Sequence, residues 1–173
     1  ASHLLGLYPG NARTDKTPEL IEACKVSLLD RGFGQKNGAN GSGWGKANKV
    51  NLWARAKDGN RAYSMLRELI NKNIAPNLWD FHPPYQMDGN CGYTSGVCEM
   101  LCYSSDDIIE LLPALPEEWK NGSVKGLCAR GGYSLDFTWE NGEIKSLSVY
   151  SSCGKKTARI KTGDEIKTVK TVG

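Results

Sequence analysis

The stretch Tyr133-Ser134-Leu135-Asp136-Phe137-Thr138-Trp139, with the dipeptide Asn141-Gly142 just beyond it, decides the fold class of the chain. Its apolar and polar side chains alternate, which is the two-residue period of a half-buried β-strand. The Asn-Gly pair predicts a tight hairpin, because its turn needs positive φ at both positions. In the returning segment Leu147 and Val149 keep the phase, whereas Ile144 falls out of phase and indicates a β-bulge. These residues predict a β domain in the C-terminal part of the chain.

Upstream of this region the apolar side chains recur with the period of helices. A Thr17-Pro18 pair predicts the start of a helix and Gly32 its end. Further helices are expected over residues 46–56, 61–71 and 92–103, and the turn between the first two is so short that they should pack antiparallel. The residues expected on the buried faces are Leu20, Ile21, Cys24, Leu28, Tyr63, Leu66, Ile70, Val97, Met100 and Leu101.

The change of period predicts a boundary near residues 104–107. We therefore expect an α+β chain, with a helical part over residues 1–105 and a small antiparallel β domain over residues 106–173. Short strands around residues 108–112, 127–129 and 158–161 are expected to complete one antiparallel sheet with the hairpin.

The composition excludes several classes of protein. The 173 residues carry 22 Lys and Arg against 19 acidic residues, and the net charge of +3 comes without a clustered basic excess. We therefore expect no nucleic-acid partner. No apolar run approaches the roughly 20 residues of a membrane-spanning helix, so no membrane partner is expected either. The start at Ala1, with neither an initiator Met nor a signal-like segment, suggests a piece of a longer chain.

No metal or cofactor is expected. The six cysteines form no C-x-x-C pair and only two histidines are present, so packing of Cys98 and Cys102 as small apolar residues is favoured over half a metal site. The glycine-rich segment 40–47 resembles a phosphate-binding loop, but Asn40 and Ala47 replace residues that such a loop requires. No G-x-S-x-G segment is present to carry a hydrolase nucleophile.

The chemically richest segment is Trp79-Asp80-Phe81-His82-Pro83-Pro84-Tyr85-Gln86-Met87-Asp88-Gly89-Asn90. It combines aromatic rings, which stack on sugar faces, with carboxylate, amide and imidazole groups that bond hydroxyls, as in a carbohydrate pocket. Asp88 could orient or deprotonate a water, or it could cap the helix expected from residue 92. His82 could contact a ligand or simply make a hydrogen bond within the loop.

Residues 82–92, HPPYQMDGNCG, resemble the HPPFQIDGNFG signature of glycoside hydrolase family 95, the inverting α-L-fucosidases. Residues 2–10 (SHLLGLYPG) are similar to the SHLYGLYPG segment of that family, and residues 49–55 (KVNLWAR) to its KINLWAR segment. The runs LLPALP at 111–116 and VKGLCARGG at 124–132 also resemble family segments. The resemblance extends to about Tyr150.

The resemblance implies the last helices of an (α/α)6 barrel followed by a C-terminal β domain. It implies that Asp88 assists activation of the attacking water and that His82 contacts the sugar. The family's general-acid Glu and its water-binding Asn pair lie upstream of the segments that this chain matches. Glu99 and Glu110 are available carboxylates, but neither lies at the acid position of the family.

The chain is thus expected to be the C-terminal fragment of an α-L-fucosidase-like inverting enzyme, inactive alone and without a cofactor. Its expected partners are a fucosylated oligosaccharide or glycan and the upstream portion of the same enzyme, and the resemblance suggests a secreted or periplasmic location. One alternative is a non-catalytic carbohydrate-binding or structural module. Another is specificity for α-L-galactosides, since the two sugars differ mainly at the C5 substituent.

Overall fold

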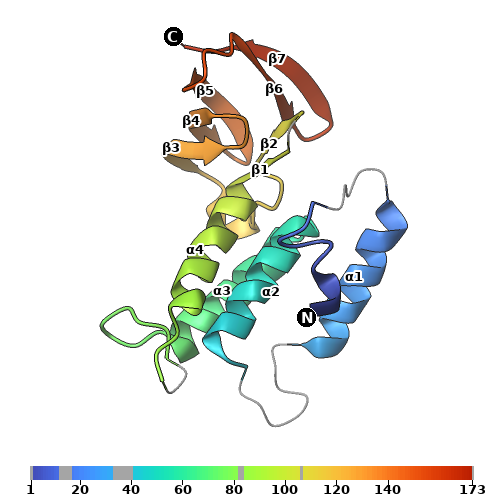
Figure 1. Cartoon of the computed structure of the whole chain (residues 1–173), viewed down its shortest axis with the longest axis vertical. Coiled ribbons are helices and arrows are strands. Elements are labelled where there is room, and N and C mark those ends of the chain that lie inside the picture. Colours follow the sequence, from blue (N-terminus) through green and yellow to red (C-terminus); the bar gives the residue numbers. More distant parts are fainter. Residues whose placement is uncertain (1, 12–16, 33–40, 82–83, 106, 173) are drawn as a thin grey trace.

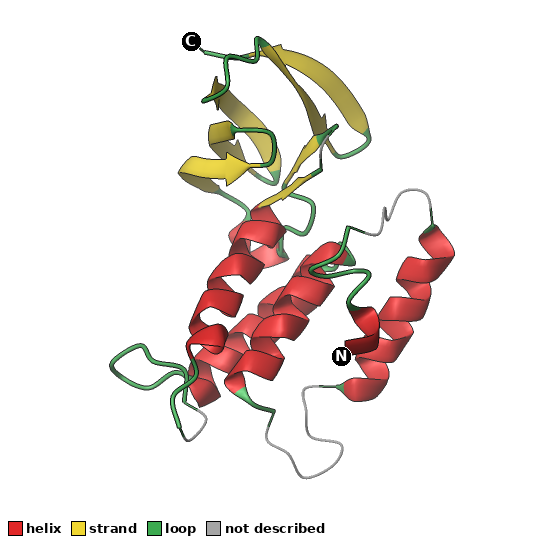
Figure 2. Ribbon diagram, viewed as in Figure 1, coloured by secondary structure: helices red, strands yellow, loops and turns green. Residues whose placement is uncertain are grey.

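The computed structural model describes residues 2–11, 17–32, 41–81, 84–105 and 107–172. The helical part comes first and the strands follow, as Figure 2 shows. The helices are η1 (Ser2–Leu4), α1 (Pro18–Arg31), α2 (Gly43–Arg55), α3 (Gly59–Asn73), α4 (Met87–Leu101) and, among the strands, η2 (Glu117–Trp119). The strands are β1 (Cys102–Ser104), β2 (Ile109–Leu111), β3 (Gly122–Ala129), β4 (Tyr133–Glu140), β5 (Glu143–Ser151), β6 (Thr157–Thr162) and β7 (Glu165–Lys170). The expected α+β class is confirmed.

The predicted hairpin is the connection between β4 and β5. Asn141 and Gly142 both have positive φ, 51° and 79°, as the turn requires. Trp139 pairs with Ile144 whereas Thr138 pairs with Ser146, so Lys145 is the extra residue of a bulge. The bulge inferred from the phase of Ile144 is therefore confirmed.

The expectation of one antiparallel sheet is wrong. The strands form a four-stranded sheet in the order β1-β2-β6-β7 and a three-stranded sheet in the order β3-β4-β5. Strands β2 and β6 pair in parallel, because the chain leaves β2, builds the whole second sheet and returns in the same direction. The inner faces of the two sheets share one core, in which Ile109 and Ile160 lie with Leu135, Phe137 and Val149.

Helices α2 and α3 pack antiparallel, as expected. Lys46 near the start of α2 donates from Nζ to Oδ1 of Asn73 at the end of α3, over 2.7 Å. Helix α4 packs closely against α2, because glycines lie at the contact. A Cβ added at Gly96 would come within 2.5 Å of a Val50 methyl group, so only glycine permits this separation.

Most of the predicted buried residues lie in the core of the helical part, among them Ile21, Leu28 and Met100. Leu20 and Ile70 are exceptions, with exposed fractions of 47% and 46%. Each lies one residue from a buried neighbour, hence about 100° around its helix, at the edge of the stripe that the core covers.

Helix α4 begins at Met87, earlier than the predicted residue 92, and its last residue, Leu101, is followed directly by β1. Because β1 belongs to the four-stranded sheet, the change from helix to strand precedes residue 106. The division into domains 1–105 and 106–173 stays a prediction.

Side chains from both parts meet where the helices adjoin the sheets. The Glu110 carboxylate on β2 accepts hydrogen bonds of 2.8 and 2.9 Å from Nζ of Lys57, and Nζ of Lys161 lies 3.5 Å away. The rings of Tyr63 and Trp119 meet edge to face, with centroids 5.6 Å apart. Over the described ranges, the chain has no helix of the length and apolarity that crossing a bilayer requires.

Candidate active site

The segment that sequence analysis singled out joins α3 to α4, at the end of the helices remote from the β domain (Figure 1). Asp88 lies in the first turn of α4 and its side chain is exposed. The helix has Gln86 as its N-cap residue, so Asp88 does not cap a helix beginning at residue 92, and that alternative is wrong. His82 lies outside the described residues. The catalytic role of Asp88 and the sugar contact of His82 stay predictions.

The amide of Asn90 ties α4 to the segment before it. Its Oδ1 accepts a hydrogen bond from the backbone N–H of Asp80, and its Nδ2 donates to the carbonyl of Leu78, both over 2.8 Å. Asn90 follows Asp88 in the same helical turn. The position of the Asp88 carboxylate is therefore linked to the backbone on either side of Trp79.

Sequence analysis did not single out Asp80, but its buried carboxyl group lies against the first turns of both α2 and α4. Its exposed fraction is 0%, and the carboxyl group lies against Gly43, the first residue of α2, and Gly89, in the first turn of α4. A Cβ at either glycine would overlap the carboxyl group. The N-terminal ends of two helices thus converge on one anionic group, an arrangement that their partial positive charges favour.

A buried cation lies near Asp80. Lys46 is 3% exposed, and its Nζ lies 3.7 Å from Oε1 of Glu68. Burial lowers the pKa of Lys46, while the negative charges of Glu68 and Asp80 act in the opposite direction. The positive charge of Lys46 and the negative charges of Glu68 and Asp80 therefore partly neutralise one another near the start of α2.

The loop presents its aromatic rings outward. The rings of Trp79 and Tyr85 lie with centroids 4.6 Å apart and planes tilted by 35°. Leu78, Phe81 and Met87 are also exposed. Five large apolar side chains within so short a segment form a surface of the kind that binds ligands or partners.

Glu99 and Glu110, the carboxylates considered above for the role of general acid, both form ion pairs. Glu99 receives two hydrogen bonds from the Arg55 guanidinium, at 2.6 and 2.9 Å. Arg55 also lies over the ring of Tyr103, 4.6 Å from its centroid. Glu110 is held by Lys57 and Lys161. Both carboxylates stabilise packing rather than lining the exposed loop.

The cysteines offer no metal centre among the described residues, where no group of three or more His, Cys, Asp and Glu side chains is arranged to hold an ion. All six cysteines are free thiols. Burial raises the pKa of Cys102 to about 12, with a smaller contribution from the charge of Glu99. Cys102 is consequently a neutral thiol near neutral pH.

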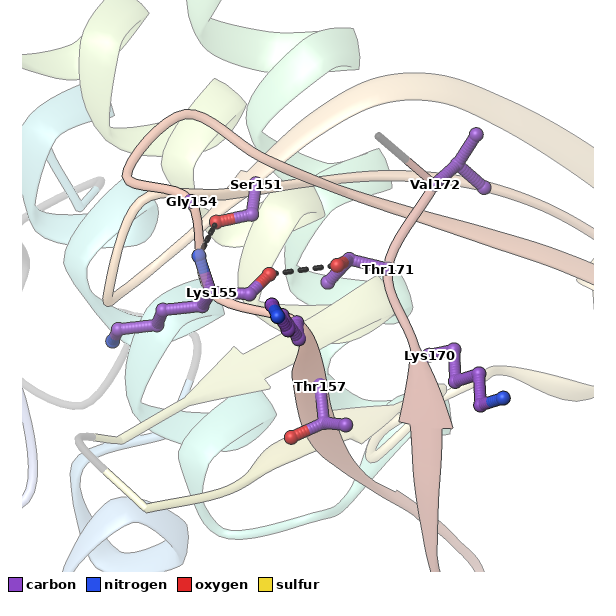
Figure 3. Close-up of a pocket in the computed structure, with 8 residues that line it drawn as sticks. Ser151, Gly154, Lys155, Thr157, Lys170, Thr171 and Val172 are labelled. Carbon is purple, nitrogen blue, oxygen red and sulfur yellow. Dashed lines mark hydrogen bonds between the residues drawn. The ribbon is translucent and has the colours of Figure 1, made fainter.

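A cavity of about 460 Å³ lies in the β domain, at the connection between β5 and β6 (Figure 3). The Oγ of Ser151 accepts a hydrogen bond from the N–H of Lys155, and Thr171 donates to the Lys155 carbonyl. The side chains of Lys155 and Lys170 point in opposite directions, so their charges do not converge on one point. This cavity lies among the strands, whereas Asp88 lies in the first turn of α4, at the end of the helices remote from the β domain.

Comparison with known proteins identifies the class of enzyme to which these residues belong. Residues 1–101 match the glycosyl hydrolase family 95 catalytic domain, and residues 103–172 match the C-terminal domain of the same family. The chain therefore belongs to glycoside hydrolase family 95, which confirms the resemblance found in the sequence.

The relatives that the chain matches are named as α-fucosidases. The chain is 36% identical to alpha-L-fucosidase 2 of Arabidopsis thaliana over 163 residues, which are 87% of this chain and 19% of the relative. It is 35% identical to probable alpha-fucosidase A of Aspergillus oryzae, over 81% of this chain and 22% of that protein. For the Aspergillus niger protein of the same name the identity is 31%, over 92% of this chain and 22% of the relative. The chain spans about a fifth of the length of these relatives.

Proposed function

We propose that this chain supplies one side of the active site of an inverting α-L-fucosidase, which hydrolyses terminal α-L-fucosides when the complete polypeptide is present. The observation that carries the proposal is the exposed Asp88 carboxylate in the first turn of α4, beside a loop of exposed aromatic rings. Membership of glycoside hydrolase family 95 and the names of the relatives support the same activity.

In this proposal Asp88 accepts a hydrogen bond from the attacking water and helps to remove its proton as the water approaches the anomeric carbon. His82 bonds a hydroxyl of the fucosyl residue. Inversion requires a second carboxyl group about 6.5–9.5 Å from the first, on the opposite side of the scissile bond, to protonate the leaving oxygen. Glu99 and Glu110 are held in ion pairs. We therefore assign the general acid to polypeptide outside this chain, and the chain alone is expected to be inactive.

The test is Asp88→Asn in the full-length protein. Loss of a general base should lower kcat/KM for α-L-fucosides by about 10²- to 10⁴-fold. Because the Asp88 side chain is exposed, the melting temperature should stay within about 1 °C of wild type. Asp164→Asn, an exposed carboxylate in the β6–β7 turn, is the matched control and should retain full activity. Full activity of Asp88→Asn would contradict the assignment.

The stereochemistry of the product gives an independent check. NMR spectra recorded during the first turnovers should show β-L-fucose before mutarotation, because inversion of an α-fucoside yields the opposite anomer. Initial formation of α-L-fucose would reject the inverting mechanism. An α-L-galactoside assayed in parallel decides between the two sugar specificities.

The exposed aromatic rings also favour a second candidate, a non-catalytic carbohydrate-binding module. Calorimetric titration of the chain with a fucosylated oligosaccharide discriminates between the two. Binding by the chain, combined with full activity of Asp88→Asn in the complete protein, would favour the module.

A further inference from the structure

The aromatic pair on the α3–α4 loop is presented to solvent rather than packed into a core. The exposed fractions are 54% for Trp79 and 37% for Tyr85, although their rings contact each other. The described stretches 78–81 and 84–87 contain one formal charge, the carboxylate of Asp80, which is fully buried. Apart from the Tyr85 hydroxyl, the exposed surface that these two side chains contribute is apolar, and neither side chain carries a charge.

Hydrogen bonds fix the backbone of Trp79 and of the residues on either side of it. Its N–H donates to Oδ1 of Asn77 over 3.2 Å, and its carbonyl accepts from the N–H of Ala75 over 2.9 Å. The Asn90 amide bonds the residues on either side of it. Because this backbone is already fixed, the segment loses little further conformational freedom when a ligand stacks on the ring.

The same contacts fix the ring pair relative to the candidate catalytic carboxylate. Asn90 and Asp88 belong to one turn of α4, and the Asp80 carboxyl lies against Gly89 between them. A ligand that stacks on Trp79 therefore contacts a segment that is hydrogen-bonded to the helical turn carrying Asp88.

We propose that Trp79 and Tyr85 form a platform for the neutral sugar on the leaving-group side of the scissile bond, a role that rests on the proposed function. A pyranose ring has a face of C–H groups that packs against an aromatic ring, and an uncharged platform suits a sugar without a charge. A platform that is open to solvent fits the leaving-group sugar, because the terminal fucosyl residue must be enclosed to exclude water other than the nucleophile.

The experiment compares two substrates in the full-length protein. One is an α-L-fucosylated neutral trisaccharide, in which the leaving group is a sugar. The other is α-L-fucosyl fluoride, in which the leaving group is a single atom that cannot reach the platform. The variants are Trp79→Ala, Tyr85→Ala and the conservative Trp79→Phe. Tyr150→Ala is the matched control, because Tyr150 is equally exposed, at 38%, but lies on β5.

Trp79→Ala and Tyr85→Ala should lower kcat/KM for the trisaccharide by about 3- to 12-fold, the loss expected for one stacking contact. The value for the fluoride should stay within about twofold of wild type. Trp79→Phe should recover most of the loss, and Tyr150→Ala should change neither substrate. The melting temperatures should stay near that of wild type, because the rings are exposed.

Equal losses on both substrates would overturn the proposal, since the rings would then act through the architecture of the site. A fall of several degrees in melting temperature would indicate instead that other segments of the polypeptide cover the rings, and would overturn it as well. Failure of the proposed function itself is distinguishable, because wild type would then hydrolyse neither substrate. In that event, equal calorimetric affinity of wild type and Trp79→Ala for the trisaccharide would reject the platform independently.

Discussion

Replacing Gly43 by alanine should destabilise the candidate site through a single contact. Gly43 is the first residue of α2, and the three atoms nearest to an added Cβ all belong to the Asp80 carboxyl group. They lie closer than 3.0 Å, a separation that real Cβ atoms do not show. Asp80 is fully buried, so neither the methyl group nor the carboxyl can move into solvent without displacing the α3–α4 loop.

The magnitude follows from two opposing effects. Overpacking of a buried position costs about 1–3 kcal/mol. Alanine recovers at most about 1 kcal/mol of helix propensity relative to glycine. We expect a net loss of about 1–2 kcal/mol, and since 1 kcal/mol corresponds to about 2–4 °C in a protein of this size, the melting temperature should fall by about 2–8 °C.

A double-mutant cycle with Asp80→Ala identifies the contact. Removing the carboxyl group clears the space that the new methyl group needs, so the double variant should be more stable than the sum of the single effects by about 1–2 kcal/mol. Urea and thermal unfolding measure all four proteins. Gly6→Ala serves as the control, because no atom lies within 4 Å of its added Cβ. Full additivity, or a Gly43→Ala variant as stable as Gly6→Ala, would refute the reasoning.

Three further predictions concern α4 and the strand that follows it. Asn90→Asp removes the donor to the carbonyl of Leu78 and places a carboxylate against that carbonyl. The substitution should lower the free energy of unfolding by about 1–3 kcal/mol and shift the tryptophan emission. Unchanged stability and emission would show that Asn90 does not hold the loop. Cys102, with its pKa raised from 9.0 to about 12 by burial, should react with iodoacetamide at pH 9 far more slowly than the exposed Cys91, as mass spectrometry of the labelled peptides can measure. The stabilisation linked to the raised pKa of Cys102 is fully present below about pH 9 and is lost as the pH rises towards 12. Cys102→Ala should therefore flatten the decline of stability between these two pH values. Equal alkylation of the two thiols would contradict the raised pKa of Cys102.

The candidate site was only partly predictable from the sequence. Asp88 and His82 could be named because a run of consecutive residues resembles a family signature. Asp80 belongs to the same chemically rich segment, but neither its type nor its spacing distinguishes it from a solvated carboxylate. Its significance comes from contacts with Gly43 and Gly89, which are brought together only when α2 and α4 pack. The glycines themselves were the available signal, since a helix tolerates them where another group approaches closely.

The sequence by itself determined the features that depend on neighbouring residues. The alternation over 133–139 and the Asn-Gly pair specify β4, its turn and the bulge of β5, because side-chain phase and positive φ are local properties. Only the tertiary structure decided which strands share a sheet, since the parallel pairing of β2 with β6 joins segments far apart in the chain. It likewise decided that Leu20 and Ile70 remain exposed and that Asp80 is buried. Burial depends on what packs against a residue, and the sequence of one segment does not specify which distant segment will do so.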